Sequence, residues 1–309
     1  MRRQTATTMG LVVLLLIDIG LVSLAFRNPF RSAPARIVTP TPTVSSSVAT
    51  ATFSTIPTVA RPVDTGSAVT LVPIDGSKAW RFTPGSCRDG GATLALTTNG
   101  GAKWTTVDSP FAMVSRLQSS DPDKLLVLGA QADCRLATQR STDKGLTWVP
   151  GGAAQMWTRD PLQPADVTNS SGRAATPCGR SGSVVSLVAL SAGAALALCA
   201  DGKAVETADA GTTWVEIARG LAPLAIDAQV VGGRLAATVA GVADGCQGLA
   251  VTSISGSTAT RVGCADVGIA LGPQLRGRIS LASVGDNWWL AIGADTFTST
   301  NAGKTWTRS

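Results

Sequence analysis

The stretch Ser141-Thr-Asp-Lys-Gly-Leu-Thr-Trp148 decides the fold of this 309-residue chain, because its pattern occurs four times. The other copies are Thr97-Thr-Asn-Gly-Gly-Ala-Lys-Trp104, Thr207-Ala-Asp-Ala-Gly-Thr-Thr-Trp214 and Ser299-Thr-Asn-Ala-Gly-Lys-Thr-Trp306. Each copy reads Ser/Thr-x-Asp/Asn-x-Gly-x-x-Trp and follows a short β-type run. An internal repeat constrains the architecture more strongly than any single motif does.

The repeat has the chemistry of a β-hairpin. Its third position carries a short acceptor side chain that can hold the amides of a turn, namely Asn99, Asp143, Asp209 or Asn301. Its fifth position is a glycine, the residue that tolerates a positive φ, namely Gly101, Gly145, Gly211 or Gly303. The tryptophan then opens the returning strand with a large apolar face to bury.

This pattern resembles the Asp-box, also called the bacterial neuraminidase repeat, of sialidase-like and sortilin-like β-propellers. The resemblance covers about residues 67–309 through short motifs, and it implies propeller blades without implying one function. A propeller blade has four strands and about 40 to 50 residues.

The spacing of the tryptophans predicts the number of blades. Trp104 to Trp148 is 44 residues, one blade, and Trp214 to Trp306 is 92 residues, two blades with one box missing. Thr252-Ser-Ile-Ser-Gly-Ser-Thr-Ala259, halfway between them, is interpreted as a decayed box. Trp148 to Trp214 is 66 residues, which we interpret as one blade with an extra loop within 151–179. The sequence thus predicts an all-β, five-bladed propeller, with six or seven blades as the alternative.

The coarse strand pattern agrees with this frame. The expected strands are 68–74, 78–83, 93–98, 112–118, 124–130, 135–141, 147–150, 183–190, 194–200, 234–240, 248–253, 278–283, 287–293 and 294–299.

Residues 1–66 are expected to precede the propeller without a core of their own. Residues 1–8 are expected to be a cytoplasmic N-terminus, followed by a transmembrane anchor at 9–26, an apolar run whose only charge is Asp18. Alternatively the run is a signal peptide cleaved near Ala25, since Ser23-Leu24-Ala25 offers a small-x-small site. Residues 27–66 are rich in Pro, Thr and Ser and predict an extended linker.

The basic charge does not indicate nucleic-acid binding. The chain has a net charge of +6, of which residues 1–36 supply +4, and no long basic run follows. High Ala, Gly, Arg and Asp content with little Lys and Glu is typical of a high-GC bacterium such as an actinobacterium.

The six cysteines predict three disulfides in an exported domain, because their number is even and all follow residue 26. In the blade frame all six fall at the face opposite the repeat turns. The expected pairs are Cys178–Cys199 and Cys246–Cys264 within or beside single blades, which leaves Cys87–Cys134 to join the first two blades. No Cys-x-x-Cys pattern and no histidine occur, so no metal and no cofactor is expected.

The residue types present argue against an enzyme. The chain has no histidine and no tyrosine, which removes the commonest general base and the nucleophile of sialidases. Glu206 and Glu216 flank one repeat and are expected to be surface residues. Another glycosidase would need two carboxyl groups at one cleft. Four aspartates expected near the cysteine-bearing face could supply such a pair of carboxyl groups: Asp133, Asp201, Asp244 and Asp266.

The candidate binding residues are Arg135, Arg180, Trp288 and Trp289. In a strand one of two adjacent tryptophans points away from the other, so one indole could meet a sugar or peptide; the alternative is that both are buried. Several arginines could line a channel mouth: Arg116, Arg135, Arg140, Arg180, Arg276 and Arg278.

Together these observations predict a membrane-tethered binding or scaffold propeller outside the cytoplasm. Its expected partner is a protein, a peptide or a cell-wall polymer, bound at the face opposite the repeat turns; the oligomeric state is left open. The alternative function is a carbohydrate-active hydrolase or lyase that uses an aspartate pair.

Overall fold

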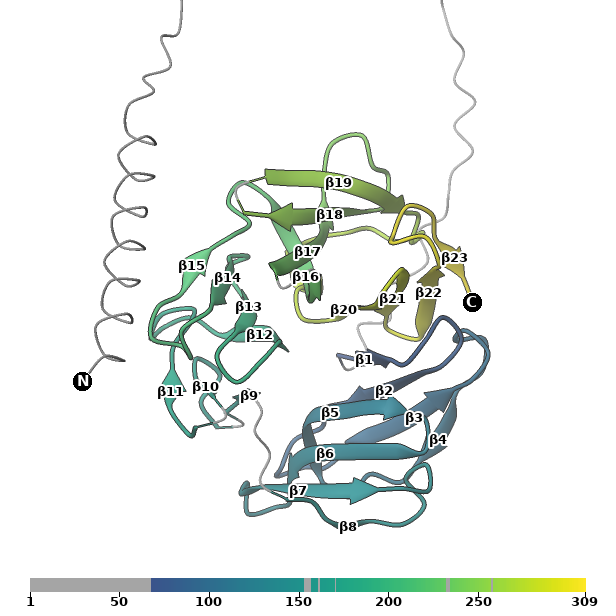
Figure 1. Ribbon diagram of the computed structural model, residues 1–309, viewed down its shortest axis with the longest axis vertical. Helices are drawn as coiled ribbons and strands as arrows, with labels where there is room; N and C mark the ends of the chain where they lie inside the picture. The colour runs from purple at the N-terminus through teal and green to yellow at the C-terminus, as the bar shows by residue number, and fades with distance from the viewer. Residues whose placement is uncertain (1–67, 153–156, 161, 170, 232–233, 257) are drawn as a thin grey trace, which may run out of the picture. The chain divides into compact units, whose positions relative to one another are not determined.

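A computed structural model describes residues 68–309 except 153–156, 161, 170, 232–233 and 257, all within one compact unit, Thr58–Ser309. Six antiparallel sheets stand around a central axis as the blades of a β-propeller (Figure 1). Five sheets have four strands and the third has three, and in every sheet the strands follow one another in sequence order.

The strand bounds, blade by blade, are as follows. Blade 1 contains β1 (Thr70–Pro73), β2 (Ala79–Thr83), β3 (Thr93–Thr97) and β4 (Thr105–Val107), and blade 2 contains β5 (Met113–Asp121), β6 (Lys124–Ala130), β7 (Leu136–Ser141) and β8 (Val149–Pro150). Blade 3 contains β9 (Thr158–Arg159), β10 (Val167–Thr168) and β11 (Ala174–Ala175), and blade 4 contains β12 (Val184–Ala189), β13 (Ala195–Cys199), β14 (Ala204–Thr207) and β15 (Val215–Glu216). Blade 5 contains β16 (Ala222–Val231), β17 (Arg234–Val242), β18 (Leu249–Ser255) and β19 (Thr258–Ala265), and blade 6 contains β20 (Ile279–Val284), β21 (Asn287–Ile292), β22 (Asp295–Ser299) and β23 (Thr307–Arg308). A short 3₁₀ helix, η1 (Pro273–Leu275), joins β19 to β20.

The prediction of five blades is wrong, because the segment taken as an extra loop is a blade of its own. Each strand of blade 3 has only two residues, so it lacks the long apolar runs that mark the other blades. Its β10–β11 turn is held by Asn169, whose Oδ1 accepts hydrogen bonds from the Ser171 and Arg173 amides at 2.9 Å. The 66 residues from Trp148 to Trp214 contain both blade 3 and most of blade 4. The spacing of the tryptophans is the same for a small extra blade as for a long extra loop, so it could not separate the two.

The four repeat turns share one set of hydrogen bonds. In the second copy Ser141 Oγ donates to Asp143 Oδ1 at 2.7 Å and accepts from the Gly145 amide at 2.8 Å. Asp143 Oδ1 also accepts from the Thr147 amide at 2.9 Å. The equivalent bonds occur in the other three copies. Two successive residues with positive φ, such as Lys144 at 63° and Gly145 at 80°, make the reversal.

Close packing is a second reason for glycine at the fifth position of the repeat, because a side chain there would lie against neighbouring side chains. A Cβ on Gly101 would lie 2.7 Å from Thr296 of blade 6, and one on Gly211 would lie 3.0 Å from Trp157 of blade 3. The repeat therefore shapes both the turn and the contact with the preceding blade.

The segment interpreted as a decayed box lies between the third and fourth strands of blade 5, where the other blades have their repeats. There Ser255 pairs with Thr258 across a tight hairpin that contains Gly256 at φ 57°. The strands on either side, β18 and β19, are longer than their equivalents in blades 1, 2, 4 and 6.

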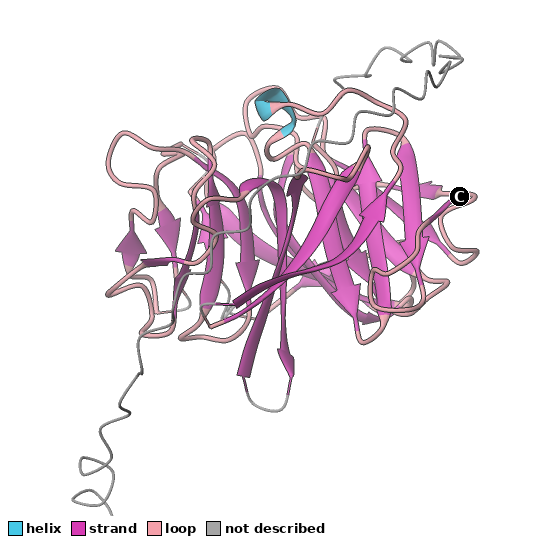
Figure 2. Ribbon diagram, turned by 90° about the horizontal axis from the view of Figure 1, so that it is seen from above, coloured by secondary structure: helices cyan, strands magenta, loops and turns pink. Residues whose placement is uncertain are grey.

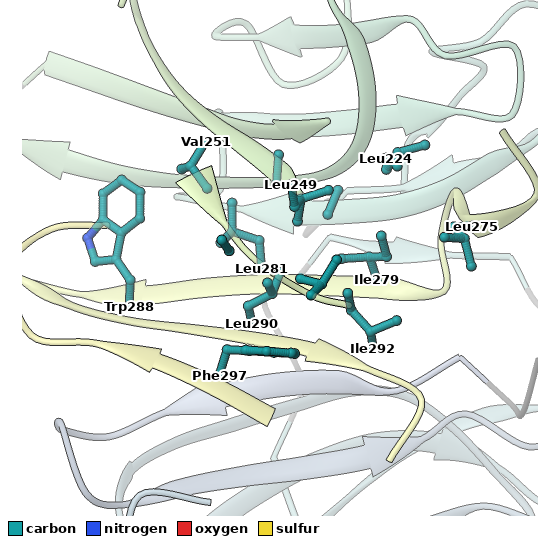
Figure 3. Close-up of a cluster of buried hydrophobic side chains, with 14 residues drawn as sticks. Leu224, Leu249, Val251, Leu275, Ile279, Leu281, Trp288, Leu290, Ile292 and Phe297 are labelled. Atoms are coloured by element: carbon teal, nitrogen blue, oxygen red, sulfur yellow. The ribbon is translucent and has the colours of Figure 1, made fainter. Parts of the chain in front are cut away.

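The core lies between adjacent blades. The largest cluster of buried side chains joins β16–β19 to β20–β22 and includes Leu249, Val251, Leu281, Leu290 and Phe297 (Figure 3). Strands inside a blade are covered on both faces, and all five residues of β13 are accordingly buried. The outermost strands β4, β8, β15 and β23 are short and largely exposed.

Among the described residues, the ring closes without a strand shared between the first and last blades. Blade 1 and blade 6 each use only their own consecutive strands, so the seam between them is made by side chains. Trp289 is 0% exposed among Leu71, Ala79, Ala282 and Ala291, and its Nε1 donates to Asp75 O at 3.0 Å. The Leu71 amide donates to Ser280 Oγ at 2.9 Å across the same seam.

Within the part of the chain that the structure describes, no helix is long and apolar enough to cross a membrane. The anchor or signal peptide expected at 9–26 and the linker expected at 27–66 lie outside the described residues.

Candidate functional site

The two edges of the ring differ in what they carry. We call the edge with the connections from second to third strands and from blade to blade the cysteine face, and the edge with the repeat turns the turn face. The disulfides join Cys87 to Cys134, Cys178 to Cys199 and Cys246 to Cys264, which are the pairs expected from the sequence. By strand order all six belong to the cysteine face, as does η1, seen at one edge of the ring in Figure 2. The Cys87–Cys134 bond ties blade 1 to blade 2.

A cavity of about 400 Å³ lies on the axis of the propeller. Its wall is formed by the innermost strands of all six blades, β1, β5, β9, β12, β16 and β20, which surround the centre of the ring in Figure 1. Most of the lining is apolar or carries hydroxyl groups, and three lining residues are ionisable: Arg116, Arg159 and Asp227. Pockets with an apolar wall and a few convergent polar groups are the usual sites of ligand binding.

Arg116 of β5, in blade 2, is hydrogen-bonded to blade 4, which follows the intervening blade 3. Its Nη2 donates to Ala189 O on β12 at 3.4 Å, and its Nε is buried without a hydrogen-bond partner. Burial lowers the pKa of Arg116 to about 10, which still leaves the guanidinium charged at neutral pH.

Arg159 of β9 is bound to the other end of the same strand. Its Nη1 donates to Val184 O at 3.3 Å and to Val185 O at 3.2 Å, and burial lowers its pKa. The residues before the two arginines, Ser115 and Thr158, are hydrogen-bonded to each other and so connect β5 to β9.

Asp227 lies across the cavity in the seam between blades 5 and 6. Its side chain accepts a hydrogen bond from Ser283 Oγ of β20, which in turn accepts one from Gln229 Nε2. Asp227 is 8% exposed, and burial raises its pKa to about 7 although these hydrogen bonds oppose the rise. Burial therefore favours the protonated, uncharged form of this carboxyl group.

The residues predicted from the sequence to bind a ligand lie elsewhere. Arg135 and Arg180 are exposed on the cysteine face, beside Cys134 and Cys178. Trp288 and Trp289 are 8% and 0% exposed, so both indoles pack inside the protein and neither offers a ring to a sugar. Among the arginines expected at a channel mouth, only Arg116 lines the cavity.

The other described carboxylates that an acid–base enzyme could use lie outside the cavity wall. Asp75 and Asp121 hold turns by accepting hydrogen bonds from the amides of Ser77, Lys78 and Asp123. Glu206 and Glu216 lie on the adjacent strands β14 and β15. Among the described residues no group of three or more Cys, Asp or Glu could hold a metal ion.

Arg159 and Asp227 were not selected from the sequence. Arg159 lies in a segment without a strand signal, and Asp227 lies within the apolar run of β16. An acid inside a buried strand is an unusual placement that could have drawn attention to Asp227.

The six blades and the axial cavity define the class of the protein as a β-propeller. No family model matches the chain, and no curated protein does. Among solved structures it is similar to the GH74 enzyme of Niastella koreensis, with 17% identity over 76% of this chain and 36% of that one, and a TM-score of 0.40. It is similar to YCF48 bound to a D1 peptide, with 16% identity over 81% of this chain and 84% of that one, and a TM-score of 0.40. It is also similar to a variant of the Aleuria aurantia lectin in complex with Fucα1-6GlcNAc, with 15% identity over 79% and 94% and a TM-score of 0.46. The chain spans about a third of the length of the GH74 enzyme.

Proposed function

We propose that this chain is a binding propeller that acts outside the cytoplasm and takes part of a protein, peptide or cell-wall ligand into its central cavity. The observation that carries the proposal is the cavity itself, about 400 Å³ on the axis, with ionisable side chains from three different blades. Its volume lies in the range of pockets that enclose small ligands, about 300 to 1,000 Å³.

The three disulfides support a location outside the cytoplasm, because such bonds persist in oxidising compartments. The shared hydrogen bonds of the four turns support their assignment as Asp-boxes. The high-GC, actinobacterial origin suggested by the composition belongs to the same proposal.

The cavity favours binding over hydrolysis by a carboxyl pair. Such hydrolysis needs two carboxyl groups about 5 to 10 Å apart across the scissile bond. Asp227 is the single carboxylic acid among the described residues that line the cavity.

The test is to fill the cavity. Ser186 lines it from β12, so Ser186→Trp places an indole where a ligand would lie. Thr260→Trp, on the exposed outer strand β19, is the matched control. Peptide and glycan arrays probed with both variants and the wild type should show ligands that the wild type and Thr260→Trp retain and Ser186→Trp loses. Retention by Ser186→Trp would overturn the cavity as the site. Release of products that stops with Asp227→Asn would show an enzyme instead.

A further inference from the structure

We propose that the ligand of the central cavity is an acidic peptide segment, bound in extended form, with two carboxylates that pair with Arg116 and Arg159. This inference rests on the proposed function, because it names the chemistry of the ligand that the cavity takes.

The first argument is charge. Removing a guanidinium from water is costly unless an anion pairs with it. Within the described ranges five ion pairs form, and neither Arg116 nor Arg159 belongs to any of them. Among the described lining residues Asp227 is the one acid, and burial raises its pKa. The described wall therefore carries a net positive charge that an anionic ligand would balance.

The second argument is the remaining hydrogen-bond donors. A guanidinium has five N–H donors. Arg116 uses Nη2 for one long contact, and its Nε is buried and unpartnered. Arg159 holds two backbone carbonyl groups through Nη1 alone. Each side chain is thus fixed to β12 through one terminal nitrogen, and the other terminal nitrogen of each guanidinium remains for a charge-assisted hydrogen bond to a carboxylate.

The third argument is the spacing of the two charges. Arg159 is fixed at Val184 O and Val185 O, where β12 changes register, and Arg116 is fixed at Ala189 O, four to five residues further along β12. At about 3.3 Å per residue, Val185 O and Ala189 O are about 13 Å apart along the strand. In an extended peptide the side chains of residues i and i+4 point to the same side and are also about 13 Å apart. Two acidic side chains four residues apart therefore match the two arginines, whereas a small inorganic oxyanion reaches only one.

A purely structural role for the arginines makes a different prediction. Val185 O and Ala189 O belong to the innermost strand of blade 4, next to the short blade 3, and the arginines cover these carbonyl groups. If this were their whole role, their loss would lower stability and leave ligand binding by the folded protein unchanged.

The experiment uses the full chain and three short serine peptides labelled at one end. One carries two glutamates four residues apart, the second carries two adjacent glutamates, and the third has glutamines four residues apart. Adjacent side chains of an extended peptide point to opposite sides, so the second peptide has the charge without the match. Fluorescence anisotropy at low salt gives the dissociation constants, and inorganic phosphate serves as competitor.

The wild type should bind the first peptide at least about tenfold more tightly than the other two, as loss of one charged hydrogen bond implies. Arg116→Met and Arg159→Met should each weaken that binding by about tenfold, and Arg116→Lys should weaken it less than Arg116→Met because the charge remains. Arg276→Met is the matched control, since Arg276 also donates to backbone carbonyl groups, Pro223 O and Ala200 O, outside the cavity wall. Circular dichroism and thermal unfolding establish that each variant is folded at the assay temperature.

Equal binding of the three peptides, or binding unchanged in both methionine variants, would overturn the inference. Competition by phosphate at the concentration of the peptide would also overturn it, because a single oxyanion would then suffice. If Ser186→Trp binds the first peptide like the wild type, the proposed function fails as well. If a neutral ligand is lost in Ser186→Trp and kept in Arg116→Met, the proposed function stands and this inference fails.

Discussion

Replacement of Trp289 by alanine tests how the ring closes between its first and last blades. The indole is fully buried in the seam between blades 6 and 1, and it donates a hydrogen bond to Asp75 O. Truncating a buried tryptophan to alanine costs about 3 to 5 kcal/mol, and the lost hydrogen bond is part of that loss. The free energy of unfolding of most native proteins is about 5 to 15 kcal/mol, so Trp289→Ala should remove a large share of it.

Trp80 provides the matched control, because it is also 0% exposed and lies in the seam between blades 1 and 2. Truncation there should cost a similar free energy of unfolding. That seam, however, is also held by the continuous chain and by the Cys87–Cys134 disulfide. Only Trp289→Ala should therefore let one seam open below the temperature of global unfolding.

Guanidinium unfolding measures the two free energies, and amide hydrogen exchange read by mass spectrometry locates the opening. In Trp289→Ala, the amides of β1–β4 and β20–β23 should exchange faster than those of the other blades, because local opening exposes them first. In Trp80→Ala the exchange should rise evenly across the blades. The same exchange pattern in both variants would refute the argument that side chains alone close the ring.

Four further results are expected. Hydrogen bonds from the turn, that of the Thr147 side chain first, lower the pKa of Asp143 to about 2, so the wild type should lose stability between about pH 4 and pH 2 as this carboxylate is protonated. Asp143→Asn should lose less stability over the same range, which urea unfolding at each pH measures. Asp227→Asn should gain stability relative to the wild type as pH rises from about 4 to about 7 and should gain no more above that, since burial raises the folded-state pKa of Asp227 to about 7 and only the wild type must keep this carboxyl group protonated in order to fold; a difference that does not change with pH would contradict this. Replacing Cys87 and Cys134 by serine should cost about 4 kcal/mol for a 47-residue loop, read from denaturant midpoints with and without reductant. Gly211→Ala should lower stability by about 1 to 3 kcal/mol, because φ there is 82° and the new methyl group meets the indole of blade 3, and a neutral effect by calorimetry would count against the seam role of the glycine.

Many strands of the four-stranded blades were predictable because local chemistry defines them, although β14 (Ala204–Thr207), β16 (Ala222–Val231) and β19 (Thr258–Ala265) were not predicted. The run expected at 124–130 coincides with β6, Lys124–Ala130, which lies between a turn at Asp121 and the cysteine-face loop. Apolar runs bounded by turn residues need no knowledge of distant contacts.

The number of blades was not predictable from the same signals. Blade 3 pairs through three two-residue strands, so its stability comes from contacts with neighbouring blades, such as Trp157 Nε1 with Ser191 O and Asn169 Nδ2 with Ala210 O. Such contacts join residues that are tens of positions apart and leave no periodic trace. The sequence signal available for this blade was Trp157 followed by a turn-forming asparagine, Asn169.

Of the ionisable residues in the cavity wall, sequence analysis named only Arg116, and it missed Arg159 and Asp227 for a related reason. Arg116 and Arg159 are 43 positions apart and meet the same strand only because the ring brings blades 2, 3 and 4 together. The paired tryptophans drew attention by their local rarity, whereas the structure uses both for packing. The cysteine pairs were accessible because the blade frame alone places all six at one edge.

The seam made by side chains between blades 1 and 6 has a consequence for how this architecture can vary. If the last blade contained a strand from the beginning of the chain, adding or removing a blade would break the hydrogen bonds of that strand. Here every described blade consists of consecutive antiparallel strands, and neighbouring blades are joined by side-chain packing, by side-chain hydrogen bonds and, between blades 1 and 2, by a disulfide. Units can then be shortened, as blade 3 is, or exchanged whole, without any hydrogen-bonded strand losing its partner. Such a ring is modular in the way a solenoid is, although it closes on itself.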